Sequence, residues 1–352
     1  MTRILKINPI NPQKDRIDEA ARVIAEGGIV VFPTETVYGI GADALNAKAC
    51  SRIFEIKGRP RDNPLIVHIS KIKQLNEVAR DVSDEFIRAA AILWPGPVTF
   101  ILKKNYNMPD EVTAGLDTVA VRMPAHPIAL RLIDAAKRPI AAPSANPSQR
   151  PSATRAEHVI ADFDGKVDVI IDGGDSAFGL ESTIINFTVK PHVLLRPGAF
   201  TIEELEKFLG KIEISKSINT QMSESDVAIA PGMKYRHYAP KKILIAVRDR
   251  KLLVEAAKTA SRNKKIAVLC SNETSEMING NAKIIKLGSE NSLYEISKNL
   301  FDSFRKLDTM DVDFAFIQTF PERGIGLALM NRIIKASGSR QLESIGELKM
   351  YT

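Results

Sequence analysis

A short basic stretch of the sequence has the residue types that bind anions. In EIKGRPRDNPLIVHIS (55–70), three cations, Lys57, Arg59 and Arg61, fall within five residues. A guanidinium group binds phosphate or carboxylate oxygens through two parallel hydrogen bonds, whereas a lysine supplies a point charge. Two prolines stiffen the turn and reduce the entropy lost when these long side chains are positioned. The stretch is therefore either a solvated basic turn or a site for a polyanion.

Two strand-like runs carry further candidates. In LIVHIS (65–70), the alternation of a strand places His68 on the face opposite Val67. A lone histidine in a strand is more often a satisfied core residue than a ligand-binding one. In DTVAVRM, Thr118 and Arg122 share one strand face. An inward-facing arginine beside small residues suggests contact with an anion such as a substrate carboxylate, and the alternative is a salt bridge with an acid elsewhere.

Two loops are rich in small polar side chains. APSANPSQRPSAT (142–154) contains Ser144, Asn146 and Ser152, which can donate to phosphate oxygens from a rigid loop. PTETVYG (33–39) places two threonines in a constrained turn after a strand. Either loop taken alone is a common feature, so neither identifies a function.

Several catalytic motifs are missing from the sequence. It contains no G-x-x-x-x-G-K-[ST] phosphate loop, no H-E-x-x-H and no Ser-His-Asp order. GIGADA (39–44) fits a dinucleotide fingerprint only superficially, because PTETVY separates it from the preceding strand. If the chain is an enzyme, we expect it to work without a side-chain nucleophile.

Composition and length set broad limits. The 352 residues favour two domains, and 44% hydrophobic with 26% charged residues is ordinary for a globular protein. The net charge of +7 permits an anionic partner such as a nucleotide or RNA without requiring one. Cys50 and Cys270 are far apart and have no metal-ligand spacing, so we expect no disulfide framework and no protein metal site. The polar N-terminus and the lack of a long apolar run predict a cytoplasmic protein without a membrane segment.

The region 1–210 alternates irregularly between predicted helices and strands. Helices are expected at 15–26, 47–57, 83–94 and 201–210. Strands are expected at 29–32, 65–69, 98–102, 118–123, 167–172, 182–187 and 192–196. The irregular order and the β-rich stretches predict a mixed α/β domain rather than a regular doubly wound one.

The rest of the chain divides at residue 241. Residues 211–240 have little periodicity, which is typical of a linker or a functional loop. In 241–352, β-rich runs at 242–247, 265–270, 282–287 and 312–320 are separated or followed by helical stretches. This alternation predicts a small parallel, Rossmann-like α/β domain.

Seven motifs in order give the sequence a family resemblance. The basic element is complete at Lys57, Arg59, Pro64 and Leu65, and the S-x-N element at Ser144 and Asn146. The chain resembles the YrdC-like domain of threonylcarbamoyl-adenylate synthases, and APGMKYRHYAP before an α/β domain is similar to their long, two-domain form. The seven motifs are FPTETVYGIGADA, KGRPRDNPLIVHI, WPGPVTFIL, VAVRMPAH, APSANPS, STIINF and LLRPGA.

The resemblance implies a fold and a reaction. It implies a YrdC-like twisted, open β-barrel with surrounding helices over 1–210 and a lid or linker over 211–240. The expected reaction is nucleotidyl transfer: L-threonine, bicarbonate and ATP give threonylcarbamoyl-AMP and pyrophosphate. The product would supply downstream machinery that modifies an adenosine of tRNA, and Mg²⁺ would accompany the ATP phosphates.

The resemblance also assigns residue roles. It places threonine at Thr34, His68, Arg122, the backbone carbonyl of Ala142, and Ser182, with Arg122 at the carboxylate. It places ATP at Lys57, Arg61, Thr118, Ser144, Asn146, Ser152 and Arg196, with Tyr235 of the linker folding over the nucleotide as a lid. Lys57 and Arg59 are the expected catalytic residues, although Arg59 either reaches phosphate or supports the turn.

Two other functions fit parts of the sequence. MKYRHYAPKK (233–242) interleaves tyrosines with cations, as a surface that stacks single-stranded RNA does, and weak RNA binding is compatible with the enzyme. The second is a carbamoyl-adenylate-forming enzyme like the related domain of hydrogenase-maturation proteins, which would accept carbamoyl phosphate and ignore threonine. The sequence leaves the role of the C-terminal domain and the oligomeric state open.

Overall fold

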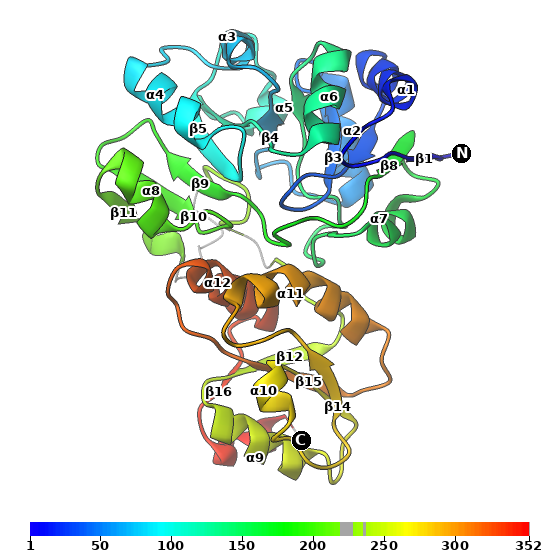
Figure 1. The fold of residues 1–352 in the computed structure, drawn as a ribbon, viewed down its shortest axis with the longest axis vertical. Helices are drawn as coiled ribbons and strands as arrows, with labels where there is room; N and C mark the ends of the chain where they lie inside the picture. Colours follow the sequence, from blue (N-terminus) through cyan, green and yellow to red (C-terminus); the bar gives the residue numbers. More distant parts are fainter. Residues whose placement is uncertain (219–227, 235–236, 352) are drawn as a thin grey trace. The chain divides into compact units, whose positions relative to one another are not determined.

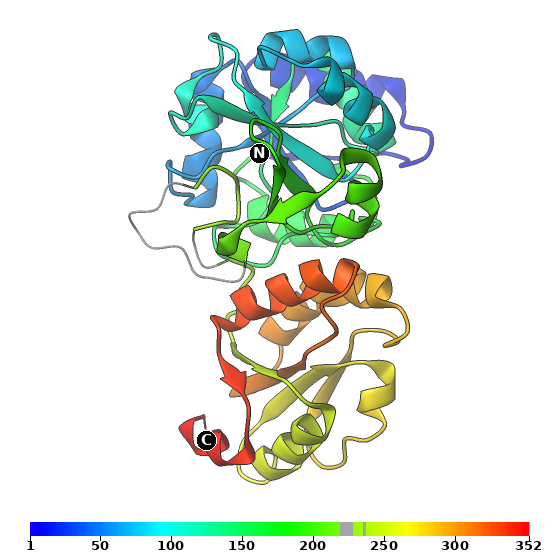
Figure 2. The ribbon, with the colours of Figure 1, turned by 90° about the vertical axis from the view of Figure 1, so that its left-hand side faces the viewer.

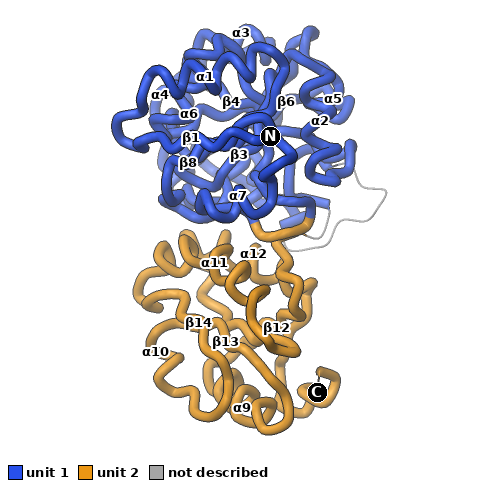
Figure 3. Tube along the Cα trace, turned by 90° about the vertical axis from the view of Figure 1, so that its right-hand side faces the viewer, with its two compact units in different colours: residues 1–148, 152–235 blue, residues 149–151, 236–352 orange. Residues whose placement is uncertain are grey.

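The chain forms two compact units (Figure 1). The computed structural model describes residues 1–218, 228–234 and 237–351. Unit 1 comprises residues 1–148 and 152–235, and unit 2 comprises residues 149–151 and 236–352 (Figure 3). Among the described residues, no helix is both long enough and apolar enough to cross a membrane.

Unit 1 is built on one mixed sheet of eleven strands. Their order is β1-β8-β2-β3-β7-β4-β6-β5-β9-β10-β11, so the two edge strands β1 and β11 do not pair and the sheet is open. Its first strands are β1 (Arg3–Lys6), β2 (Val30–Phe32), β3 (Gly39–Asp43), β4 (Ile66–His68), β5 (Val98–Lys103) and β6 (Thr118–Arg122). The others are β7 (Ile140–Ala141), β8 (Val169–Asp172), β9 (Thr183–Asn186), β10 (His192–Arg196) and β11 (Ile212–Ile214). The predicted mixed α/β class is confirmed.

Helices cover this sheet. They are α1 (Lys14–Ala25), α2 (Ala47–Lys57), α3 (Leu75–Val78), α4 (Asp84–Leu93), α5 (Asp110–Thr113), α6 (Pro127–Ala136), α7 (Ala156–Phe163) and α8 (Ile202–Leu209), with single 3₁₀ turns at Ile72–Gln74 and Lys216–Ile218. The apolar faces of α1 and α6 share a core with β1, β2 and β8 that includes Ile17, Leu132 and Ile171.

Helix α2 matters most for the site because of how it starts and stops. The Asn46 side chain accepts a hydrogen bond from the Ala49 amide and begins the helix. Gly58 follows with φ of 61°, a left-handed conformation that glycine adopts without steric cost, and it ends the helix. Lys57 is therefore the last helical residue, held at the entrance of the basic turn.

Unit 2 is a five-stranded parallel sheet in the order β14-β13-β15-β12-β16. The strands are β12 (Ile243–Val247), β13 (Ile266–Cys270), β14 (Lys283–Lys286), β15 (Phe314–Gln318) and β16 (Gln341–Leu342). Helices α11 (Leu293–Asp308) and α12 (Ile325–Ser337) lie on one side of this sheet and α9 (Arg250–Ala260) lies on the other (Figure 2). A short α10 (Asn272–Ser275) and a 3₁₀ helix (Ile345–Met350) complete the unit. The predicted parallel, Rossmann-like sheet is confirmed.

Candidate functional site

Two of the polar residues predicted on strands, His68 and Arg122, lie in one row with Thr99 across the sheet of unit 1. His68 on β4 is in register with Arg122 on β6, and Arg122 is in register with Thr99 on β5. Residues directly opposite one another on paired strands share a face of the sheet. The three side chains therefore belong to one face, and all three residues are buried.

Arg122 has an acidic partner inside this face. Its Nη2 donates to Glu35 Oε1 at 2.6 Å, and both side chains are less than one-tenth exposed. Its Nη1 donates to Thr36 Oγ1 at 2.8 Å and its Nε to the Gly96 carbonyl at 3.2 Å. A guanidinium has five N–H donors, so these three bonds leave it able to contact a further anion. The salt bridge offered as the alternative for Arg122 thus exists, with Glu35 as the acid.

His68 is neutral under ordinary conditions. Burial, with a smaller contribution from the positive charge of Arg122, lowers the pKa of His68 from 6.5 to about 3. Its ring meets Phe32 edge-on, with the ring centroids 6.3 Å apart. Its Nδ1 is buried and has no hydrogen-bond partner within the described part of the chain. A buried ring nitrogen without a partner is costly in a purely structural histidine, which favours a ligand-binding role.

Ser182 and Arg196 extend the row at the other side. The Ser182 hydroxyl lies 2.7 Å from the Thr99 hydroxyl. Arg196 on β10 donates from Nη2 to the Ser182 hydroxyl at 3.1 Å and to the Ser182 carbonyl at 3.0 Å. Arg196 and Ser182 were predicted to hold different substrates, and the structure places them in direct contact.

The loop after β2 forms the wall beside Arg122. The Thr34 hydroxyl donates to the Val37 carbonyl at 2.6 Å and lies 2.8 Å from the Thr36 hydroxyl. The Thr34 carbonyl accepts a bond from the Ser176 hydroxyl at 3.0 Å. This tightly bonded turn fixes Glu35 and Thr36, which in turn fix the guanidinium of Arg122.

Lys57 holds the S-x-N loop rather than pointing into solvent. Its Nζ donates to the Ser144 carbonyl at 2.6 Å and also to the Asn146 carbonyl. Its own carbonyl accepts from the Ser148 amide at 2.8 Å, and the Ser144 hydroxyl donates to Asn146 Oδ1 at 2.6 Å. The ammonium therefore orders the loop whose hydroxyl and amide groups were predicted to meet ATP.

The two arginines of the basic turn differ from Lys57. Arg59 donates from Nε to the Asn63 carbonyl at 3.2 Å and from Nη2 to the Pro64 carbonyl at 2.9 Å. These bonds close the turn, so the structure shows the supporting role that the sequence left open for Arg59. Arg61 has a side chain 67% exposed and pairs loosely with Glu55 at 3.5 Å. Its contact with ATP stays a prediction.

The remaining predicted residues are distributed as follows. The Ser152 hydroxyl is buried and donates to Glu181 Oε1 at 2.6 Å. Ala142 follows β7 and its amide bonds to the Ile66 carbonyl at 2.8 Å, which brings it beside β4. Thr118 begins β6 and is partly exposed. Tyr235, the predicted lid, lies outside the described residues.

Part of the predicted linker covers the same face of the sheet. Two residues before the polar row, Ile66 and Ala120 form an apolar cluster with Ala228, Ala230 and Met233. Arg196 Nη1 also donates to the Pro231 carbonyl at 3.2 Å. Residues 228–233 therefore pack directly beside the polar row within unit 1.

Sequence reasoning missed four residues of this site, Glu35, Thr36, Thr99 and Glu181. The acid in PTETVYG was a usable signal for Glu35, because an inward-facing arginine needs an anionic partner. Thr99 lies on the strand next to Arg122, which only the pairing of β5 with β6 reveals.

The described residues contain no group of three or more His, Cys, Asp or Glu side chains that could hold a metal ion.

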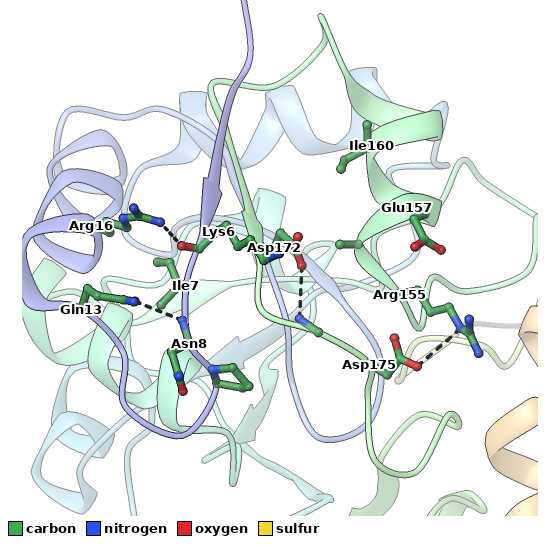
Figure 4. A pocket seen from close by; sticks show the side chains of 13 residues that line it. Lys6, Ile7, Asn8, Gln13, Arg16, Arg155, Glu157, Ile160, Asp172 and Asp175 are labelled. Carbon is green, nitrogen blue, oxygen red and sulfur yellow. Dashed lines mark hydrogen bonds and ion pairs between the residues drawn. The ribbon is translucent and has the colours of Figure 1, made fainter.

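A separate hollow in unit 1 contains none of the predicted site residues (Figure 4). It has a volume of about 640 Å³ and lies where β1 and β8 end beside the starts of α1 and α7. Cations such as Lys6 and acids such as Glu157 line it together, and Arg155 pairs with Asp175 at 3.6 Å. Because both charges are present, the hollow has no preference for an anion, and we do not assign the nucleotide to it.

Two family models match the chain. The model of the Sua5, YciO and YrdC family, described as "Telomere recombination", matches residues 22–198. A second model, described as "Threonylcarbamoyl-AMP synthase, C-terminal domain", matches residues 200–338.

Relatives match over nearly the whole chain. A "Threonylcarbamoyl-AMP synthase" of Pyrococcus abyssi is 48% identical over 338 residues, which is 93% of this chain and 97% of that protein. One of Bacillus subtilis is 42% identical and covers 92% of this chain and 94% of its own length. The crystal structure of P. abyssi Sua5 complexed with L-threonine has a TM-score of 0.91 at 46% identity, covering 97% of this chain and 100% of that one. The chain therefore belongs to the Sua5/YrdC family, in its two-domain threonylcarbamoyl-AMP synthase form.

Proposed function

We propose that the chain is an enzyme that joins L-threonine, bicarbonate and ATP into threonylcarbamoyl-AMP and releases pyrophosphate. The observation that carries the proposal is the polar row of His68, Arg122 and Thr99, with Ser182 beside it, on one buried sheet face. Within this row His68 Nδ1 has no partner among the described residues and the Arg122 guanidinium has N–H donors beyond its three bonds, so both can bind a ligand. The names of the relatives, and the L-threonine in the P. abyssi structure, support threonine as the ligand of this row.

Threonine would lie against the row on β4 and β6. Arg122 would bind its carboxylate, since two of the guanidinium N–H donors remain beyond the bonds to Glu35, Thr36 and Gly96. The neutral His68 would accept or donate one hydrogen bond without adding charge. Thr34, Ser182 and the Ala142 carbonyl would contact the remaining polar groups of the amino acid.

ATP would lie against the loop that Lys57 orders. The hydroxyl and amide groups of this loop, with Lys57 itself, would contact the phosphates, and Arg196 would join from β10. The full proposed set is Lys57, Arg61, Thr118, Ser144, Asn146, Ser152, Arg196 and Tyr235. Mg²⁺ bound to the phosphates would neutralise part of their charge.

The chemistry requires alignment more than a reactive side chain. The threonine amine and bicarbonate form a carbamate with loss of one water molecule, and a carbamate oxygen then attacks the α-phosphorus of ATP as pyrophosphate leaves. Holding the two reactants in line and neutralising negative charge supply most of the acceleration in such transfers. Residues 228–233, which cover the apolar half of the same face, would exclude water from the labile carbamate and anhydride. A cytoplasmic location, where ATP and tRNA meet, goes with this proposal.

Pyrophosphate release tests the proposal. The full chain with ATP and Mg²⁺ should release pyrophosphate only when both L-threonine and bicarbonate are present. If release continues unchanged without threonine, the proposal fails. If carbamoyl phosphate replaces both threonine and bicarbonate, the carbamoyl-adenylate reaction is the correct one.

RNA contact is a secondary proposal. Lys241, Lys242 and Arg340 line a small hollow of about 240 Å³ in unit 2 that contains no acidic lining residue. A weak, salt-dependent affinity for tRNA that survives neutralisation of Lys57 and Arg61 would place RNA on a surface separate from the ATP site.

A further inference from the structure

A three-residue segment of unit 2 interrupts the loop that carries the proposed ATP contacts. Residues 149–151 belong to unit 2, whereas Ser144 before them and Ser152 after them belong to unit 1 (Figure 3). We propose that helix α11 anchors this segment, so that Arg150, Arg305 and Asp308 are positioning residues for ATP. The proposal rests on the proposed function and gives the C-terminal domain a part in substrate binding.

The first anchor is an ion pair within unit 2. Arg150 Nη2 contacts Asp308 Oδ2 at the end of α11, and the two side chains are 26% and 10% exposed. The other carboxylate oxygen, Oδ1, accepts the Lys241 amide at 2.5 Å. One largely buried carboxylate thus joins the segment to α11 and to the start of β12, in surroundings where solvent screens the charges little.

The second anchor lies one turn earlier on the same helix. Arg305 Nη2 donates to the Pro151 carbonyl at 2.8 Å. Phe301, Arg305 and Asp308 are spaced i, i+4 and i+7, which places them on one helix face. Phe301 stacks on Tyr238 with the ring centroids 5.3 Å apart. This face of α11 therefore holds both residues 149–151 and the chain that leads into β12.

The backbone at the anchor has an unusual conformation. Gln149 has φ of 69° and Tyr238 has φ of 68°, left-handed values that residues other than glycine rarely adopt. The Ala239 amide donates to the Gln149 carbonyl at 2.9 Å, and Arg150 Nη1 donates to the Ala239 carbonyl at 3.3 Å. Such conformations persist where the surroundings fix them, as the bonds to α11 and to Ala239 do here.

The flanks of the segment are fixed in unit 1. The Ser148 amide donates to the Lys57 carbonyl at 2.8 Å, and the Ser152 hydroxyl donates to Glu181 at 2.6 Å. The loop is thus held at its two flanks and at its tip. Loss of the tip anchor would let the loop sample other conformations, and ATP would have to reorder it on binding. Threonine would be spared, because His68 and Arg122 lie on strands, Thr34 lies on the loop after β2, and the other two proposed contacts directly adjoin β7 and β9.

Calorimetric titration of the full-length chain with ATP and with threonine tests whether the anchoring of residues 149–151 by α11 supports ATP binding. Asp308→Asn keeps the shape of the side chain but removes its charge, and Arg150→Gln removes the other partner. We expect each variant to bind ATP about tenfold more weakly, with threonine affinity within about twofold of the wild type. In the pyrophosphate assay the KM for ATP should rise while kcat at saturating ATP changes less than about threefold.

Two further variants sharpen the result. Asp311→Asn removes the carboxylate of an exposed ion pair with Lys265 in unit 2 and should leave ATP affinity unchanged. The double reversal R150E/D308R restores the ion pair but not the bond to the Lys241 amide, so it should recover part of the ATP affinity that either single reversal loses.

Three results would overturn the proposal: unchanged ATP affinity in a folded Arg150→Gln or Asp308→Asn, an equal loss of threonine affinity, or no recovery in the reversal. Should Asp308→Asn not fold, Arg150→Gln, at the more exposed partner of the ion pair, decides the question alone. Failure of the proposed function would appear differently, in the wild type, as pyrophosphate release that ignores threonine.

Discussion

Replacing Lys57 with methionine removes the side-chain hydrogen bonds between α2 and the loop that Lys57 orders. The wild-type ammonium donates to the carbonyls of Ser144 and Asn146, and Lys57 is only 4% exposed. Methionine has a similar length and fills the same space without a donor. The change therefore removes charge and hydrogen bonds while it leaves the packing of α2 nearly intact.

The size of the effect follows from these contacts. A hydrogen bond from a charged donor contributes about 1.5–3 kcal/mol, so the two carbonyl bonds contribute at most about 3–6 kcal/mol. Water that reaches the two carbonyls in the variant recovers part of this, and we expect the unfolding free energy to fall by about 3 kcal/mol. If Lys57 also meets a phosphate, ATP binding weakens by a further 1.5–3 kcal/mol or so, which is about 10- to 150-fold.

Calorimetric titration with ATP and with threonine, after a check of the fold by circular dichroism, measures both effects. Lys48→Met is the matched control, because Lys48 is exposed on the same helix. We expect Lys57→Met to lose ATP affinity and to keep threonine affinity within about twofold. A folded Lys57→Met variant that binds ATP as tightly as the wild type would refute the role assigned to Lys57.

Three further predictions follow from the site. His68→Gln should remove an acid sensitivity of the fold. The unfolded histidine takes a proton near pH 6.5 and the folded one only near pH 3, so the wild type loses about 2 kcal/mol of stability between pH 6.5 and 4.5 that the variant keeps. Urea titrations in which the unfolding free energies of the two proteins change equally between these pH values would contradict this. Arg59→Gln should lower the unfolding free energy by about 1–3 kcal/mol, because it removes the bonds to the Asn63 and Pro64 carbonyls, and should change kcat less than about threefold. A loss of about 100-fold in kcat at unchanged stability would instead make Arg59 a catalytic contact. Glu35→Gln should destabilise the unliganded chain by about 3–5 kcal/mol, because it leaves Arg122 buried without a counter-charge. Threonine should then raise the Tm of Glu35→Gln more than that of the wild type, since its carboxylate replaces the lost charge, and an equal rise in both would argue against Arg122 as the carboxylate site.

Local sequence patterns predicted the elements that carry the site. The alternation in LIVHIS and DTVAVRM placed His68 and Arg122 on faces of strands, and β4 and β6 bear them side by side. The 3.6-residue period ended by Gly58 placed Lys57 at a helix end, as the structure has it. These features depend on neighbours within a few residues, which a single sequence displays.

Features that depend on distant contacts were not predictable in the same way. No strand is predicted from the sequence at GIGAD (39–43), yet these residues form the fully buried β3, which pairs with β2 and β7. Glycine is uncommon in strands, so the local composition does not indicate this one. Glu35 lies 87 residues from Arg122 in the sequence, so no local spacing predicts that the two side chains form an ion pair. The helix α6 was also missed, although His126 caps it and Pro127 begins it in the manner of a good helix start.

The contacts of the three cations in the basic turn were also not predictable from the local sequence. Three charges within five residues suggested either a solvated basic turn or a site for a polyanion, but their neighbours in space give the three side chains three different surroundings. Lys57 binds two carbonyls of a distant loop, Arg59 closes its own turn, and Arg61 lies in solvent. Only the fold could distinguish them, because the carbonyls that Lys57 meets are 87 and 89 residues away in the sequence.

The most direct test follows the carbon of bicarbonate into the product. The full-length chain would be incubated with ATP, Mg²⁺, L-threonine and either ordinary or ¹³C-labelled bicarbonate, and the nucleotide products would be weighed by mass spectrometry. We predict a threonylcarbamoyl-AMP whose mass rises by one unit with labelled bicarbonate, formed together with an equal amount of pyrophosphate. An adenylate that lacks the labelled carbon, or ATP consumption without any threonine-containing nucleotide, would contradict the proposed reaction.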